Sequence, residues 1–482
     1  MIELRPVGYV IGLLVAVLGV TMLAPMAMDL WRNDDNWMAF VEAAILTSLT
    51  GGLLALACSN GVDSGLTVQQ AFLLTSGAWA VLPFFGALPF MFGAPDVGMA
   101  DAYFEAMSGL TTTGATVFEG LDAMPAGVLL WRGILQWLGG LGIVIVAMVF
   151  LPVMRVGGMQ FFKSEGFDTL GKVLPRSKDI SAALIRVYVG LTLLCSLSYF
   201  ALGMTTFEAV VHAMTTLSTG GFSTSDQSFG KFSGAAEYAA ALFMVLASVP
   251  FVRLIQLMGG APLQLFRDVQ VRAYLRWIGY AVLAIVAHRV LVLGDPTEET
   301  VRETLFNVIS FFSGTGYGST DVTLWGPFAF VVLIAVGAIG GCTSSTGCSI
   351  KVFRYLVLFE AIRGQISRLY SPHRVVLLRL QGRFLEGDVV DSVIAMFTFF
   401  ILGFGLLTIA LSMTDLTTET AITAAWTSIF NVGPAFGPEV GPTGAMHAFP
   451  DSAKWLMSGG MLVGRLEVVA VLVLFMGRFW RG

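Results

Sequence analysis

The stretch Gly314-Thr315-Gly316-Tyr317-Gly318 follows an apolar segment that is too short to cross a membrane, and this combination decides the fold. Three further glycine-centred stretches stand in the same context, namely Thr112-Thr113-Gly114-Ala115, Ser218-Thr219-Gly220-Gly221-Phe222 and Asn431-Val432-Gly433-Pro434. They recur about every hundred residues, which indicates an internal repeat of one structural unit. Four such units in one chain predict a pseudo-fourfold arrangement around a common axis.

The four stretches resemble degraded copies of the Thr-Val-Gly-Tyr-Gly loop of potassium channels. In that loop, backbone carbonyl oxygens replace the hydration shell of an ion. Such a path needs backbone angles that are closed to a residue with a Cβ, and we expect them at Gly114, Gly220, Gly316 and Gly433. One such glycine alone would carry no weight in a chain with 55 glycines. The candidate filter residues are Thr112, Thr113, Gly114, Ser218, Thr219, Gly220, Gly314, Thr315, Gly316, Asn431, Val432 and Gly433.

The composition is that of a polytopic membrane protein. Hydrophobic residues make up 56% of the 482 residues and charged residues 12%, and the mean hydropathy is +0.80. Soluble domains carry about 25% charged residues. Long apolar runs therefore predict ten spans and an all-α integral membrane fold. The four cysteines show neither metal-ligand spacing nor a secreted disulfide pattern.

Two spans in residues 1–60 precede four units, each predicted to contain a span, a half-length helix, a glycine loop and a second span. The units are expected at 67–157, 181–259, 270–365 and 386–482. A half-length helix cannot cross a hydrocarbon core of about 30 Å. Non-helical backbone at that depth is tolerated only where protein encloses it or where it lines a watery cavity. The half-length helices are expected at 99–111, 205–217, 300–313 and 418–430.

The distribution of charge predicts the orientation. Most of the 27 Lys and Arg residues fall on one side if both termini are cytoplasmic, which is the positive-inside pattern. The glycine loops then lie on the outer side, where Arg132 is expected to extend toward the interface. Acidic residues concentrate on that outer side, where they either form a negative vestibule that attracts cations or are merely tolerated. The acidic residues considered are Asp96, Asp101, Glu105, Asp122, Asp226, Glu298, Glu299 and Glu303.

Residues 337–349, in the second span of the third unit, are almost all Gly, Ala, Ser, Thr or Cys. Glycines weaken a helix, and this one can unwind where protein encloses it. The alternative is a tightly packed contact between helices through small residues. Lys351 ends the segment and is expected to face the cytoplasm.

Arg465 lies deep within the last span. An arginine at that depth is costly unless it faces a cavity or finds a partner. Glu467 is about 200° further around the helix and should not be that partner. Pairing of Arg465 with backbone carbonyls is the purely structural alternative.

Together, these motifs resemble the TrkH/TrkG-type subunits of the Trk/Ktr/HKT superfamily of potassium transporters. The resemblance rests on 109–117, 131–142, 218–222, 431–434 and 464–467, and it extends over essentially the whole chain. It implies two N-terminal spans, four membrane-pore-membrane repeats, and a homodimer with one pore per subunit in the bacterial cytoplasmic membrane. Ala115 and Pro434 depart from the channel pattern, so the filter should hold fewer defined ion sites than a channel.

The resemblance also implies roles for particular residues. Potassium is the expected substrate and the only metal, held by backbone carbonyls. Glycine at 114 fits potassium, whereas serine there accompanies sodium transport in plant relatives; sodium is the alternative. The small-residue segment would be a gate that blocks the pore, with Arg465 as an electrostatic barrier. The gate residues are Gly340, Gly341, Cys342, Thr343, Ser344, Ser345, Thr346, Gly347 and Arg465.

The basic loop 351–383 is the expected docking site of a cytosolic partner. The resemblance implies a TrkA-like regulatory ring that carries the nucleotide, and this chain itself needs no cofactor. The simpler interpretation is that the loop orients the chain and contacts anionic membrane lipid.

Other classes of protein fit the sequence less well. An alternating-access transporter predicts inverted repeats and charged residues at the midplane, whereas these repeats share one orientation. A membrane enzyme needs convergent acidic or histidine residues within its spans. No phosphate-binding glycine loop follows a strand, and neither ATP hydrolysis nor a nucleic-acid partner is expected. The histidines lack metal-ligand spacing; they are His212, His288, His373 and His447.

Overall fold

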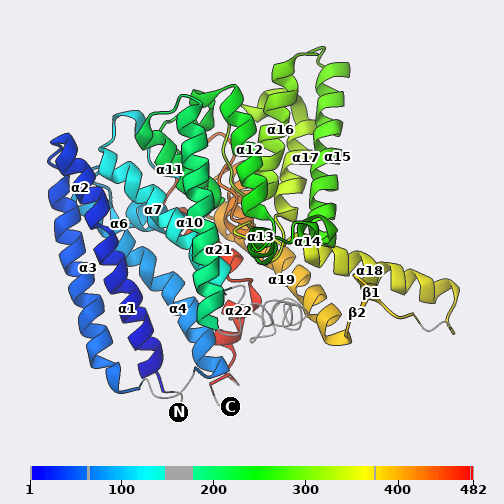
Figure 1. The fold of residues 1–482 in the computed structure, drawn as a ribbon, viewed down its shortest axis with the longest axis horizontal. Coiled ribbons are helices and arrows are strands. Elements are labelled where there is room, and N and C mark those ends of the chain that lie inside the picture. The colour runs from blue at the N-terminus through cyan, green and yellow to red at the C-terminus, as the bar shows by residue number, and fades with distance from the viewer. Residues whose placement is uncertain (1–2, 62–65, 147–176, 374–375, 478, 481–482) are drawn as a thin grey trace.

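The computed structural model describes residues 3–61, 66–146, 177–373, 376–477 and 479–480. Figure 1 shows a helical molecule in which the described strands form one short hairpin, β1 (Arg379–Leu380) with β2 (Arg383–Phe384). Among the described residues, eight helices are long and apolar enough to cross a membrane, and two sharply bent helix pairs would bring the number to ten. The predicted all-α membrane fold is confirmed.

Three helices precede the first unit and lie together at one side of the molecule, in blue in Figure 1: α1 (Arg5–Thr21), α2 (Leu23–Arg32) and α3 (Trp37–Ala57). Asp29 of α2 is fully buried. Its carboxylate accepts hydrogen bonds from Asn36 Nδ2 at 3.0 Å and from Gly127 N, at the start of α7. A carboxylate at a helix N-terminus is favourable, so Asp29 ties the N-terminal helices to the first unit.

The four units follow in chain order. The first contains α4 (Val68–Gly86), α5 (Leu88–Phe92), α6 (Met99–Leu110) and α7 (Ala126–Ile145). The second contains α10 (Ser177–Ala201), α11 (Thr206–Leu217), α12 (Ala235–Ser248) and α13 (Phe251–Met258), and α14 (Leu263–Arg267) follows it. The third contains α15 (Val269–Leu291), α16 (Glu298–Ser313), α17 (Gly326–Ile339) and α18 (Val352–Tyr370). The fourth contains α19 (Gly387–Ser412), α20 (Thr418–Phe430), α21 (Asp451–Arg465) and α22 (Val469–Leu472).

The short helices α6, α11, α16 and α20 contain 12, 12, 16 and 13 residues and match the predicted half-length helices closely. Their starts follow from local chemistry. In α11, Thr205 and Glu208 form a capping box, in which each side chain accepts a hydrogen bond from the backbone N–H of the other. Each short helix is therefore an element in its own right rather than a frayed part of a span.

Two of the second spans are bent sharply at a break in the helix. α12 and α13 meet at 103°, and Pro250 stands at the break. Proline has no N–H to donate, so a helix cannot continue through it without losing a hydrogen bond. In the fourth unit, α21 and residues 469–475 meet at 104°, where Glu467 has a left-handed backbone with φ 59°.

The second span of the third unit is interrupted as its composition predicts. The chain leaves α17 at Ile339 and resumes helix at Val352. α18 then extends away from the helical body, toward the right in Figure 1. The end of the predicted second span of the first unit, 147–154, lies outside the described residues.

Candidate ion pathway

All four short helices end in a residue with left-handed backbone. In the first, second and fourth units, the next backbone N–H also reaches back five residues, as in a Schellman C-cap. In the first unit, Thr112 has φ 53° and Thr113 N donates to Ser108 O at 2.9 Å. The left-handed residues are Thr112, Thr219, Gly314 and Asn431.

These helix ends fix the register of the glycine loops, which we name loop 1 (112–115), loop 2 (219–222), loop 3 (314–317) and loop 4 (431–434). A glycine stands two residues after each helix end: Gly114, Gly221, Gly316 and Gly433. The first three have φ values of 85°, 80° and 77°.

Gly221, rather than Gly220, is therefore the counterpart of Gly114, and the predicted position in the second unit is wrong by one residue. Neither Gly220 nor Gly433 has the left-handed backbone that we expected of it. The two adjacent glycines leave the register of loop 2 open in the sequence, and the end of α11 decides it.

The loops form a closed ring in chain order. A Cβ on Gly114 would overlap a carbonyl oxygen of loop 2, and one on Gly221 would overlap a carbonyl oxygen of loop 3. A Cβ on Gly316 would lie 2.7 Å from Gly433 N in loop 4. One on Gly433 would lie 3.1 Å from the carbonyl carbon of Gly114. Only glycine permits backbones to approach so closely.

The four equivalent glycines line one cavity of about 160 Å³. Asp226 also lines it, and its carboxylate accepts hydrogen bonds from Gly120 N and Leu121 N, each at 3.1 Å. Among the acidic residues considered for a negative vestibule, Asp226 is the one that lines this cavity. Several of the others lie in ion pairs, namely Asp101–Lys454, Glu105–Arg132, Asp122–Lys231 and Glu303–Arg289, whereas Glu298 and Glu299 share Arg302 with Glu237.

We name the short helices α6, α11, α16 and α20 the pore helices. Hydroxyl groups on two of them donate hydrogen bonds to backbone carbonyls of loops 3 and 4. Ser310 Oγ donates to Tyr317 O at 2.8 Å, and Thr427 Oγ1 donates to Pro434 O at 2.7 Å. The Tyr317 hydroxyl lies 2.5 Å from Thr215 Oγ1 in the second unit. Buried, mutually satisfied hydrogen bonds of this kind fix a single backbone geometry.

An irregular segment, which we name the inner loop (340–351), lies against the ends of three pore helices. Cys348 Sγ is 3.7 Å from Thr112 Oγ1, and Cys348 N donates to Ser313 O at 3.4 Å. Ser349 Oγ donates to Phe430 O at 3.0 Å. Because these contacts come from three different units, Cys348 and Ser349 lie across the common axis.

The inner loop is also docked into the break between α12 and α13. Ser248 O accepts from Cys342 N at 2.8 Å, and Ala247 O accepts from both Thr346 N (3.3 Å) and Thr346 Oγ1 (3.0 Å). Across the break, Phe251 N donates to the loop at 3.0 Å. The end of a helix leaves such carbonyls without intrahelical partners, so the bend in the second unit supplies the partners of the loop.

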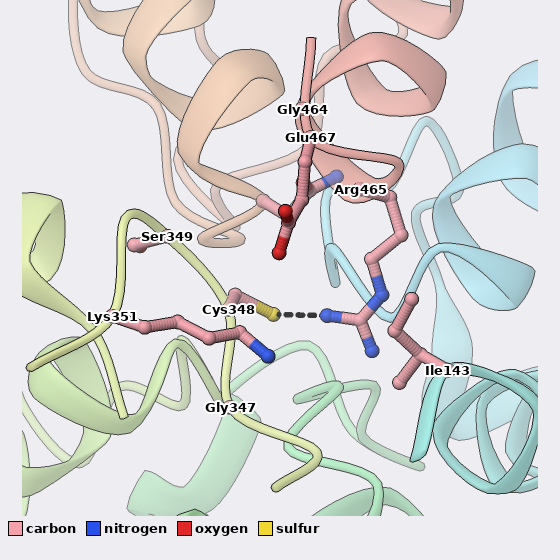
Figure 2. Close-up of a pocket in the computed structure, with 9 residues that line it drawn as sticks. Ile143, Gly347, Cys348, Ser349, Lys351, Gly464, Arg465 and Glu467 are labelled. Atoms are coloured by element: carbon pink, nitrogen blue, oxygen red, sulfur yellow. Dashed lines mark hydrogen bonds between the residues drawn. The ribbon is translucent and has the colours of Figure 1, made fainter. Parts of the chain in front are cut away.

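Arg465 reaches the inner loop from α21, as Figure 2 shows. It is 5% exposed, and its Nη1 donates to Cys348 Sγ at 2.9 Å while Nη2 donates to Thr346 O at 3.3 Å. These partners belong to another unit, not to its own helix. The guanidinium thus places a positive charge where the carbonyl ends of the pore helices converge.

A cavity of about 20 Å³ beside Arg465 is lined by two further charged residues, Lys351 and Glu467. Lys351 is 7% exposed, and its side chain extends toward Cys348 in Figure 2, so the expectation that it faces the cytoplasm is wrong. Its left-handed backbone, with φ 79°, turns the chain just before α18. Glu467 pairs with Arg354 and not with Arg465, as predicted.

Arg132 is buried rather than extended toward the interface, which corrects a second expectation. It is 1% exposed, and its Nε lies 2.7 Å from the carboxylate of Glu105, which is 0% exposed. The signal that could have revealed this pair is Glu105 itself, an acid near the middle of α6.

His212 is buried behind the loops, with its ring nitrogens 2.9 Å from Glu208 O and 3.0 Å from Ser223 Oγ. No group of three or more His, Cys, Asp or Glu residues that could hold a metal occurs among the described residues.

A chain with several candidate membrane spans, whose four glycine loops close into a ring around one cavity, has the features of the class of membrane transport proteins. The family model TrkH, described as a cation transport protein, matches residues 36–481, and the chain belongs to this family. The family resemblance predicted from the motifs is confirmed.

Several characterised proteins are similar over their full length. The Trk system potassium uptake protein TrkI of Halomonas elongata is 37% identical over 478 residues, which cover 99% of this chain and 97% of that protein. The Trk system potassium uptake protein TrkH of Escherichia coli is 33% identical over 487 residues, which cover 99% of each. The crystal structure of the potassium transporter TrkH from Vibrio parahaemolyticus matches with a TM-score of 0.91, 31% identity and 100% of both chains.

Proposed function

We propose that this chain takes up potassium across the bacterial cytoplasmic membrane through a ring of backbone carbonyls. The observation that carries the proposal is the closed ring of four loops whose equivalent glycines line one cavity. Relatives over the whole length are named as potassium uptake proteins, which supports the choice of ion. Potassium is the substrate, and the chain needs no cofactor for this role.

Selectivity arises in this proposal from carbonyls that replace the hydration shell of the ion. The contributing positions are Thr112, Thr113 and Gly114 and their counterparts in loops 3 and 4, together with Thr219 and Gly221 in loop 2, where the Gly220 carbonyl already accepts a hydrogen bond from Gln136. Glycine at all four equivalent positions keeps the ring narrow, because any side chain there would meet the neighbouring backbone. Sodium is the alternative ion.

The inner loop and Arg465 form the gate in this proposal. Three pore helices end against Cys348 and Ser349, so an ion that has passed the ring meets the loop next. Arg465 adds a positive charge that opposes a cation in the same place. Opening requires the loop to leave both Arg465 and the break between α12 and α13.

A cytosolic TrkA-like ring that binds the nucleotide would govern this gate, and the chain would act as a homodimer with both termini in the cytoplasm. The basic residues available to such a partner are exposed, whereas Lys351 and Arg354 are buried and cannot contribute. The exposed ones are Arg363, Arg368, Arg379 and Arg383.

The experiment that tests the proposal is flux of K⁺, Rb⁺, Na⁺ and Li⁺ through the purified chain in liposomes, with wild type beside Gly114→Ser and Gly98→Ser. Gly98 begins the same pore helix, and a Cβ there meets nothing within 4 Å. Serine is a favourable N-cap, so this control should behave as wild type. Wild type is expected to pass K⁺ and Rb⁺ and to exclude Na⁺, and Gly114→Ser to lose this discrimination. Equal Na⁺ flux through wild type would refute the potassium assignment.

The gate has its own test, made without any cytosolic partner. Arg465→Gln is expected to raise the basal K⁺ flux, because it removes the charge and weakens the hold on the inner loop. Arg363→Gln, at a side chain that is 82% exposed, is the matched loss of one positive charge and should leave the flux unchanged. Basal flux of Arg465→Gln at the wild-type level would contradict the assigned role.

A further inference from the structure

The second span of the first unit carries a buried polar face that the ion path alone does not explain. Arg132 and Gln136 lie about one turn apart on α7, so their side chains leave the same side of the helix. They are 1% and 0% exposed. Burial of such groups is unfavourable unless their polar atoms find partners, and both find them at the glycine loops.

The Arg132 guanidinium joins the two residues that directly follow loops 1 and 2. Its Nη2 donates to Thr116 Oγ1 at 3.1 Å, and its Nη1 donates to Ser223 O at 2.9 Å. Its centre lies 4.1 Å from the centroid of the Phe222 ring, in cation–π contact. One side chain therefore fixes the outer ends of two neighbouring loops relative to each other.

Glu105 holds the same junction from the pore helix α6. Its carboxylate accepts from Arg132 Nε at 2.7 Å, from Thr116 Oγ1 at 2.9 Å and from Val117 N at 3.0 Å. A buried ion pair is destabilised strongly when one partner is removed, because the other charge is left without compensation. The pair with these extra hydrogen bonds is thus a stiff connection rather than a surface contact.

Gln136 forms hydrogen bonds with the residues on both sides of Gly221 in loop 2. Its Nε2 donates to Gly220 O at 2.7 Å, and its Oε1 accepts from Phe222 N at 3.0 Å. A Cβ on Gly220 would overlap this side-chain amide, so helix and loop are in direct contact. The Gly220 carbonyl therefore already accepts a hydrogen bond, although the sequence predicted that this carbonyl would contribute to the ion path.

We propose that Glu105 of α6 and Arg132 and Gln136 of α7, together named the clamp, are positioning residues that set the cation selectivity of the ring. The inference rests on the proposed function. A ring that distinguishes cations through its carbonyls must keep their spacing when a smaller ion enters. The hydrogen bonds that support loops 3 and 4 come from uncharged side chains, such as the hydroxyls of Ser310 and Thr427. The clamp supplies an ionic support at loops 1 and 2, and loosening it lets loop 2 close around Na⁺.

The test compares wild type, Gln136→Met and Glu105→Gln as full chains in liposomes, with the ratio of Na⁺ to K⁺ flux as the readout. Methionine keeps the length of Gln136 and removes both hydrogen bonds to loop 2, so we expect the ratio to rise about tenfold. Trp137→Phe is the matched control. It removes the 3.1 Å bond from Trp137 Nε1 to Thr192 on the same helix, away from the loops, and should leave the ratio unchanged.

The outcomes separate the inference from the proposed function. Wild type that passes Na⁺ as readily as K⁺ would overturn both. A selective wild type with an unchanged ratio in folded Gln136→Met would overturn the clamp alone, even if Glu105→Gln does not fold. A purely structural role predicts equal losses of K⁺ and Na⁺ flux, and this too would overturn it. A raised ratio in Gln136→Met with an unchanged Trp137→Phe supports it.

Discussion

Thr346→Val tests how the inner loop is held closed. The substitution keeps the size of the side chain and removes the hydroxyl that donates to Ala247 O at 3.0 Å. Ala247 O keeps Thr346 N as a donor at 3.3 Å, so no buried carbonyl is left without a partner. The loss is then that of one neutral hydrogen bond, about 0.5–1.5 kcal/mol. If the bond exists only while the loop blocks the path, the ratio of open to closed molecules rises about 2- to 12-fold.

The assay is the open probability of single molecules in planar bilayers with K⁺ and without a cytosolic partner. Thr343→Val is the matched control on the same loop, because Thr343 Oγ1 is buried and has no hydrogen-bond partner among the described residues. Its removal leaves the bond from Thr343 N to Gln270 Oε1, at 3.0 Å, in place. The control is expected to open as rarely as wild type.

Two results would refute this reasoning. A folded Thr346→Val with the open probability of wild type would mean that the contact with Ala247 does not favour the closed state. An equal rise in Thr343→Val would mean that any change of packing in the loop opens it, and that the hydrogen bond is not the cause.

Three further predictions concern other parts of the chain. Gly221→Ala is expected to abolish selective K⁺ flux in liposomes, because its Cβ would overlap a backbone carbonyl of loop 3. Gly220→Ala should be milder, because the atoms nearest to its Cβ belong to the Gln136 side chain, which can shift more easily than backbone; the reverse order would refute the corrected register. Asp29→Ala should lower the free energy of unfolding in detergent by about 1–3 kcal/mol, because Gly127 N and Asn36 Nδ2 lose their acceptor. Asp35→Ala, at an exposed side chain, should leave this free energy unchanged. Hydrogen bonds from Thr420 and Thr417 hold the pKa of Glu439 below its ordinary value of 4.5, so the stability that the charged form contributes is present above pH 4.5 and is lost as the pH falls through the lowered pKa. The difference in melting temperature between wild type and Glu439→Gln should accordingly disappear in acid, and a difference that grows there would contradict the assignment.

The repeat and its short helices could be predicted from the sequence because both follow from local rules. Length alone excludes a full span at 418–430, and the structure has a helix at those residues. The glycines and small side chains at 340–349 likewise predict a helix that unwinds, and none of these residues is helical. Local composition was sufficient in both cases, since neither depends on which element lies opposite.

The errors arose where a partner distant in sequence decides the outcome. Arg132 was expected near the interface, but Glu105 on another helix draws it inside. Lys351 was expected to face the cytoplasm, but it is buried and lines a cavity together with Arg465 and Glu467 of the fourth unit. The register of loop 2 depended on where α11 ends, and a Gly-Gly pair offers two equal choices. A rule for helix ends would have resolved the last of these from the sequence alone.

The four loops of the ring differ in sequence, so a mutation can change the ion preference of the ring through one loop at a time. In a channel of four identical chains, one substitution alters every loop at once. Here the residue after each central glycine differs, being Ala115, Phe222, Tyr317 and Pro434. A mutation therefore changes the side chain in one loop and leaves the sequence of the other three loops as it was. The preference of such a chain for one cation over another can therefore change in small steps, because each substitution alters one loop here and four loops in a symmetric tetramer.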